Sequence, residues 1–168
     1  KEHFTSKTCV GSPLVESFVG FALAKMKEVD VHVQTSQKKL LLLGDSLAVD
    51  SHYVDEVYKV VVNMLEGSRI QVLVLDSAVN PLSTIISKVR ESSIVTGFTG
   101  PQLTHTIWMR QGGAVIELSR SFYCHCYSAL ANWVGLHHER MIDLPRHPSD
   151  AALLLLQRIS ALFSIGIK

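Results

Sequence analysis

Residues 38–45 read KKLLLLGD, and this stretch decides the fold class. Four consecutive leucines, Leu40–Leu43, follow two lysines and end at a glycine and an aspartate. A short run that is apolar at every position and closed by turn residues is typical of a strand buried on both faces of a sheet. From Val54 to Leu65 apolar side chains recur at helical spacing, and Gly67 ends that segment. A strand followed by a helix predicts the first half of a βαβ unit.

The same alternation continues to the end of the chain. Further strands are expected at Ile70–Leu75, Ser93–Gly97, Ala114–Leu118 and Arg140–Asp143. The segments between and after them predict helices at 81–91, 101–110, 123–133 and 149–163, where Asn80 and Ser149 are candidate N-caps. Strands and helices that alternate with short connections predict an α/β fold, namely a parallel Rossmann-like sheet with helices on both faces.

The chain divides into two parts at residue 38. Residues 1–37 lack a clean periodicity and are interpreted as a lead-in segment with one strand near Thr8–Val10. Residues 38–168 form the Rossmann-like domain, and 168 residues in all suit one domain. Because the first residue is Lys1 and not Met, we expect the sequence to be part of a longer product.

Charge and cysteine content narrow the function classes. Lys and Arg number 16 and Asp and Glu 15, so the net charge of +1 gives no reason to expect a nucleic-acid partner. No apolar run approaches the roughly 18 residues that span a bilayer, so no membrane span is expected in this segment. An odd count of three cysteines argues against a closed disulfide framework, and Cys124 and Cys126 lie too close together for an ordinary bridge. We therefore expect free thiols, and no metal site.

In parallel sheets, ligands bind outside the carboxyl ends of the strands. The 97–102 loop lies at such an end, and Gly97 and Gly100 would let the backbone approach a phosphate at a helix N-terminus. The alternative is a structural turn, in which Thr99 and Gln102 form a capping box. Glu117 could accept two ribose hydroxyls or simply point to water. The candidate nucleotide-binding residues are thus Gly97, Thr99, Gly100, Gln102 and Glu117, and no residue is assigned as catalytic.

The stretch Ser83–Leu118, STIISKVRESSIVTGFTGPQLTHTIWMRQGGAVIEL, resembles the carboxyl-terminal half of family 61 glycosyltransferases, which include O-GlcNAc and plant xylan transferases. The likeness reaches Asp143 and, more loosely, starts at Lys38. It rests on RESSIV at 90–95, on Gly100, Leu103 and Thr104, on Trp108–Met109 and on AVIEL at 114–118. The resemblance implies the donor-binding domain of a GT-B enzyme, a UDP-sugar donor with no other cofactor, and a missing amino-terminal domain. It also implies the lumen of the secretory pathway.

Departures from the family pattern shape the functional interpretation. Phe98 or Thr99 replaces the family's loop histidine, and Asp45 and Asp50 stand where its arginines face a diphosphate. Carboxylates there would repel that group. The favoured interpretation is therefore an eroded nucleotide-sugar site in a structural or interaction subunit of a larger assembly, an intracellular or organellar one, with other protein chains as partners. The alternatives are an active inverting half-domain and a small-molecule-binding module outside sugar chemistry.

Overall fold

Five parallel strands form one sheet in the computed structural model, which describes residues 12–25, 38–45, 51–120 and 125–164. The strands are β1 (Lys38–Gly44), β2 (Ile70–Asp76), β3 (Ile94–Phe98), β4 (Ala114–Leu118) and β5 (His137–Met141). Their order is β2-β1-β3-β4-β5, and every neighbouring pair is parallel. The α/β fold with a parallel Rossmann-like sheet is therefore confirmed, as is the expectation that the first four strands are parallel neighbours.

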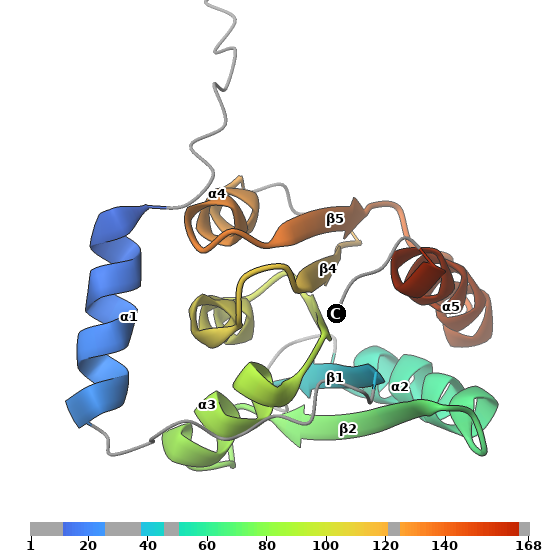
Figure 1. Cartoon of the computed structure of the whole chain (residues 1–168). Helices are drawn as coiled ribbons and strands as arrows, with labels where there is room; N and C mark the ends of the chain where they lie inside the picture. The colour runs from blue at the N-terminus through green and yellow to red at the C-terminus, as the bar shows by residue number, and fades with distance from the viewer. Residues whose placement is uncertain (1–11, 26–37, 46–50, 121–124, 165–168) are drawn as a thin grey trace, which may run out of the picture.

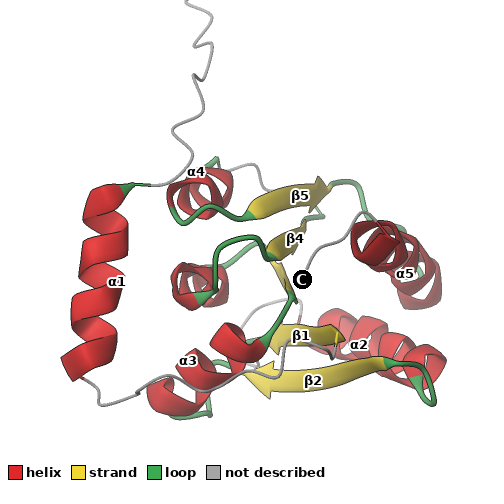
Figure 2. Cartoon of the chain, viewed as in Figure 1, coloured by secondary structure: helices red, strands yellow, loops and turns green. Residues whose placement is uncertain are grey.

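Helices cover both faces of the sheet (Figures 1 and 2). One face carries α2 (Ser51–Leu65) and α5 (Pro148–Ser164), which pack against each other. The opposite face carries α3 (Leu82–Glu91), the 3₁₀ helix η1 (Pro101–Trp108) and α4 (Cys126–Trp133). A further helix, α1 (Pro13–Lys25), lies outside this second layer (Figure 1).

Strand β1 contributes buried side chains to both core layers, one on each face of the sheet. Leu40 and Leu42 belong to the layer under α2 and α5, whereas Leu41 and Leu43 belong to the layer under α3, η1 and α4. All four side chains are 0% exposed. Full burial of a leucine is worth about 1.5–3 kcal/mol, so the run stabilises both layers at once. The all-apolar run predicted this arrangement.

Four local expectations were wrong or lie outside the described residues. The lead-in segment contains α1, whose periodicity is weak because none of its residues is buried. Strand β5 begins three residues before the predicted 140–143 strand, because pairing with β4 outweighs the polar sequence of 137–139. No side-chain hydrogen bond caps α3, since the Asn80 amide donates to Asp76 O instead, and Ser149 lies inside α5. The strand expected near Thr8–Val10 is outside the described residues.

Cys126 forms a disulfide, so the expectation of free thiols was wrong for this residue. The partner cysteine lies outside the described residues. An odd count leaves one cysteine over but does not prevent the other two from pairing, and the count alone says nothing about which sulfur atoms meet in space.

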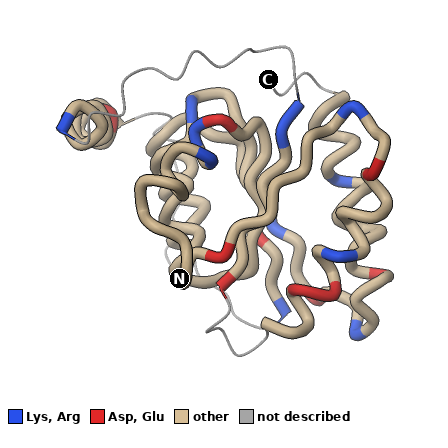
Figure 3. The backbone as a smooth tube through the Cα atoms, turned by 90° about the horizontal axis from the view of Figure 1, so that it is seen from below, with Lys and Arg blue, Asp and Glu red and all other residues tan. Residues whose placement is uncertain are grey.

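Charged residues of both signs alternate along the described backbone and do not gather on one face (Figure 3). Among the residues that the structure describes, no helix is long and apolar enough to span a bilayer.

Candidate functional site

The chain changes direction across the sheet at β1. From β1 it crosses outward to β2, returns to β3 on the other side of β1 and then continues to β4 and β5. The loops after β1 and β3 therefore leave the sheet in opposite directions, and ligands of open parallel sheets bind in the crevice at this switch point. Gly44 and Asp45 begin the loop after β1, and Phe98–Gly100 form the loop after β3.

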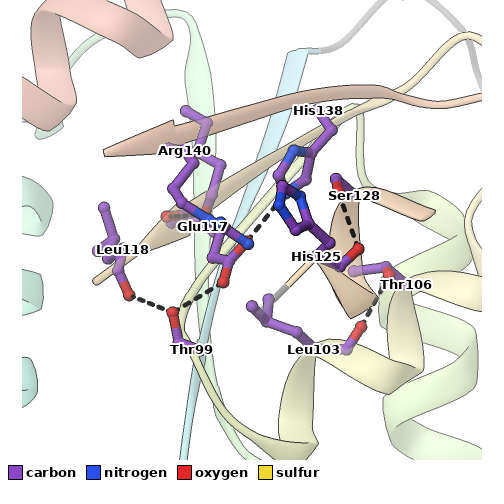
Figure 4. A network of polar contacts seen from close by, with 11 residues as sticks. Thr99, Leu103, Thr106, Glu117, Leu118, His125, Ser128, His138 and Arg140 are labelled. Atoms are coloured by element: carbon purple, nitrogen blue, oxygen red, sulfur yellow. Dashed lines mark hydrogen bonds and ion pairs between the residues drawn. The ribbon is translucent and has the colours of Figure 1, made fainter. Parts of the chain in front are cut away.

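Four polar side chains lock the ends of three neighbouring strands beside this point, and we call Thr99, Glu117, His138 and Arg140 the carboxyl-edge network (Figure 4). Glu117 Oε1 accepts a hydrogen bond from Thr99 Oγ1 at 2.8 Å. Glu117 Oε2 accepts two from the Arg140 guanidinium, at 2.9 Å from Nε and 2.8 Å from the terminal nitrogen. The same oxygen lies 3.0 Å from His138 Nε2. One carboxylate thus links β3, β4 and β5.

Strand register explains why these residues meet. Glu117 lies opposite Gly97 on β3 and opposite Arg140 on β5. His138 precedes Arg140 by two positions, and Thr99 follows Gly97 by two, so all of them share the sheet face under η1 and α4. Neither His138 nor Arg140 is among the candidate site residues predicted from the sequence. Their spacing of two within a polar strand was the available signal, but without strand pairing it does not point to Glu117.

Glu117 is a buried carboxylate that stays ionised. Burial by itself would raise its pKa, but hydrogen bonds from His138, Arg140 and Thr99 and the charge of Arg140 outweigh that effect, so the pKa of Glu117 lies below its ordinary value. The side chain is 0% exposed, and both oxygens are bonded within the protein. Glu117 therefore does not point to water, which was one expectation. In this structure its oxygens accept hydrogen bonds from protein side chains, whereas the other expectation was that they accept ribose hydroxyls. Its role in this structure is to hold the strand ends together.

Close packing requires glycine at both Gly97 and Gly100 in the 97–102 loop. A Cβ atom at Gly97 would lie 3.0 Å from Leu103 Cδ2 and 3.1 Å from Leu43 O. At Gly100 it would lie 2.4 Å from Oε1 of the buried Gln102 side chain. These distances explain the glycines structurally, and they do not test the anion-binding interpretation of the loop.

The capping box predicted for this loop was wrong, although η1 does begin at Pro101, within the expected range. Thr99 Oγ1 donates to Glu117, and Gln102 Nε2 donates to Phe98 O at 2.8 Å. Both side chains are therefore used elsewhere, and no side chain caps η1. The pattern Thr-x-x-Gln has the right spacing for a cap, but the buried carboxylate competes more strongly for the threonine hydroxyl.

Aromatic and cationic groups line the other side of the same edge. The Tyr53 and Phe98 rings contact each other edge to face, with centroids 5.8 Å apart. The Arg120 guanidinium lies over the Tyr53 ring, 4.7 Å from its centroid. Tyr53 also donates its hydroxyl to Pro145 O, which fixes the ring at the start of α2. Sequence reasoning missed this cluster, since its members come from three segments that are far apart in the chain.

We expect Gly100→Ala to lower the free energy of unfolding by about 1–3 kcal/mol, the cost of leaving a buried hydrogen-bonding group unsatisfied. The new methyl group must displace the Gln102 amide from Phe98 O. Gly20→Ala is the matched control, because its Cβ meets nothing within 4 Å in α1, and it should be neutral or stabilising. Urea denaturation of both variants measures the difference, and equal midpoints would contradict the packing described for the loop.

The described residues include no group of three or more His, Cys, Asp or Glu side chains that could hold a metal ion. At the centre of the site, the two titratable side chains Glu117 and His138 are bonded to each other. Such a pair is suited to fixing a loop. A nucleophile activated by a neighbouring base would need a different arrangement.

Several solved structures resemble this chain, each with low sequence identity. A flavodoxin-like domain from a Synechococcus species is 14% identical, with a TM-score of 0.48, over 71% of this chain and 99% of that one. A diflavin flavoprotein A3 from a Nostoc species is 12% identical, with a TM-score of 0.49, over 76% and 99%. An NADPH-quinone reductase from P. pentosaceus is 10% identical, with a TM-score of 0.46, over 73% and 97%. No family model and no curated protein matches the chain.

The expected resemblance to family 61 glycosyltransferases was therefore wrong. No model of that or any other family matches, and these structural neighbours are flavodoxin-like proteins and an oxidoreductase. The glycosyltransferase function, in its eroded and its active form, and the UDP-sugar donor are withdrawn with it. The stretch Ser83–Leu118 spans α3, β3, η1 and β4, and helix–strand–glycine–strand patterns of this kind recur in any doubly wound sheet. What stands is the fold: a five-stranded parallel α/β sheet with helices on both faces, whose strand order 2-1-3-4-5 is that of doubly wound flavodoxin-like sheets.

Proposed function

We propose that this domain is a binding module for a small polar molecule of nucleoside size that lacks a phosphate group. The ligand lies at the carboxyl edge of the sheet, between the loops that follow β1 and β3. The carboxyl-edge network carries this proposal, because it fixes the loop after β3 beside the switch point. Of the sequence candidates, Gly97, Thr99, Gly100 and Gln102 shape the wall of the site, and Glu117 holds that wall from behind.

The energetics of the network support a role in positioning. A buried ion pair is often no more stable than apolar residues of the same volume, because both charges lose their water. The network therefore adds little stability over an apolar replacement, but it holds Thr99 in one place. Residues held in one geometry before a ligand arrives reduce the entropy cost of binding.

The charges that follow β1 and β2 argue against a phosphate group on that side of the edge, where the nearby Arg120 guanidinium lies over the Tyr53 ring. Asp45 follows β1 and Asp76 ends β2, and the segments 44–50 and 76–81 contain no Lys or Arg. Two unit charges 4 Å apart near a protein surface interact by about 4 kcal/mol, so a phosphate beside Asp45 would be strongly repelled. Tyr53, which is partly exposed and lies edge to face with the buried Phe98 ring, offers apolar surface for a planar ring instead.

We also propose that the module acts together with other protein chains. A domain that binds a ligand and carries out no chemistry influences a process through the proteins that it contacts.

Calorimetric titration with two matched pairs tests the ligand class: adenosine with AMP, and riboflavin with FMN. At least one nucleoside-type compound should bind with a Kd below about 1 mM, a free energy of about −4 kcal/mol. Its monophosphate should bind at least tenfold more weakly. Tighter or equal binding of the monophosphate, or no binding of any of the four, would overturn the proposal.

Removal of the Asp45 charge provides a second test of the preference for the unphosphorylated compound. Asp45→Asn should improve binding of the monophosphate and leave binding of its unphosphorylated partner nearly unchanged. Glu66→Gln is the matched control, because Glu66 follows α2 at the opposite edge of the sheet. Equal effects of the two substitutions would show that Asp45 does not face the ligand.

A further inference from the structure

We infer that the domain has a second ligand site, at the amino edge of the sheet, that takes a small singly charged anion with an apolar tail, such as a medium-chain carboxylate. This site is independent of the one proposed above, since it lies at the opposite ends of the strands. It is a cavity of about 330 Å³ between the starts of β1 and β2 and the ends of α2 and α5. Ligand pockets in proteins range from about 300 to 1,000 Å³.

The polar groups at its mouth are cationic or hydroxylic. Lys38 and Arg69 both line the cavity, together with Ser68, Ser160 and Ser164. No Asp or Glu lines it, and neither cation forms a salt bridge with any carboxylate of the described residues. Two full positive charges at a cavity with no carboxylate in its lining exceed the partial negative charge of the helix ends and favour an anion.

The contacts of Lys38 leave it available to a ligand. Its ammonium donates to Phe163 O at 3.4 Å and lies 5.0 Å from the centroid of the Phe163 ring. The carbonyl belongs to the last turn of α5, so the lysine offsets the negative end of that helix. An ammonium carries three donors, and the remaining two can point to an anionic head group.

The walls behind these cations are apolar. Leu65 and Ile70 line the cavity from α2 and β2, and Leu156, Ile159 and Phe163 line it from α5. Ile159 and Phe163 are buried and extend into the core under α2 and α5. Head-group charge at the mouth and apolar side chains behind it match an amphiphile better than a fully polar ion such as inorganic phosphate.

Four probes on the whole chain separate the contributions of head and tail: octanoate, acetate, octanol and octylamine, each titrated while backbone amide NMR shifts are followed. Octanoate should shift amides around Lys38, Ser68 and Ser160 saturably. Acetate lacks the tail, octanol the charge and octylamine the correct sign, so each should bind at least tenfold more weakly. Equal binding of octanol and octanoate, or no saturable shift with octanoate, would overturn the proposal.

Substitution of the cations completes the test. The double variant Lys38→Ala/Arg69→Ala removes two exposed side chains and should weaken octanoate at least tenfold. Lys59→Ala is the matched control, because Lys59 is an exposed lysine that lines a different pocket, beside Val74. Octanoate affinity that is unchanged in the double variant, or that falls equally in the control, would show that these cations do not form the site. Since the nucleoside titrations probe the other edge, either site can fail without the other.

Discussion

Replacement of Glu117 by glutamine should lower the free energy of unfolding by about 3–5 kcal/mol at neutral pH, because it leaves a buried charge without its partner. The Arg140 side chain is 12% exposed and bonds Glu117 Oε2 through two nitrogens, so the variant removes the Glu117 charge from a buried ion pair. Urea denaturation of the two proteins measures the change. Glu56→Gln is the control, since Glu56 pairs with Lys59 at the surface, and it should leave the midpoint nearly unchanged. Equal midpoints for the wild type and Glu117→Gln would contradict the structure of the network.

The same comparison should depend on pH with a defined sign. The pKa of Glu117 is lower in the folded protein than the value of about 4.3 for an unperturbed glutamate. Its ionisation therefore stabilises the fold at pH values above about 4.3, and that contribution disappears as the pH falls through the folded-state pKa. The stability difference between the wild type and Glu117→Gln should therefore shrink as the pH falls below 4. A difference that grows on acidification would mean that the folded-state pKa is raised.

Truncation of Leu42 to alanine should lower the free energy of unfolding by about 2–5 kcal/mol, through lost burial and the cavity that remains. Leu42 is 0% exposed in the interior strand β1 and packs in the layer under α2 and α5. Chemical denaturation monitored by far-UV circular dichroism gives the value. Leu154→Ala in α5 is the control, because Leu154 is 42% exposed and should change stability by less than about 1 kcal/mol. Similar losses for the two leucines would mean that β1 is not buried between the two helical layers.

The sequence predicted the layers of the fold because their signals are local. The run Leu40–Leu43 is apolar without interruption, and the segment Ala114–Leu118 is apolar except for Glu117. Only a doubly covered parallel sheet buries such strands on both faces. By contrast, α1 has no buried residue, so no apolar stripe marked it as a helix. Strand β5 is polar, and only its pairing with β4 identifies it.

The candidate site was only partly predictable. Gly97, Gly100 and Glu117 stood out because glycine and carboxylate are unusual at the ends of apolar strands. Their roles depend on residues that are distant in sequence, since Arg140 lies 23 positions after Glu117 and Leu43 lies 54 positions before Gly97. A spacing rule such as the capping box relates only residues that are close in sequence. The interaction of Thr99 with Glu117 spans 18 positions. The order and register of the strands, which local sequence patterns do not give, are therefore needed to predict which of these residues meet.

One measurement tests ligand binding at the switch point most directly: backbone amide NMR spectra of the whole chain, titrated with the nucleoside-type compound that binds in calorimetry. Saturable shifts should concentrate at Asp45 and at Phe98–Gly100, the described ends of the two loops that leave the sheet in opposite directions. Amides at the amino edge, such as those of Lys38 and Arg69, should not move. Shifts centred on the amino edge, or spread evenly over the sheet, would contradict binding at the switch point.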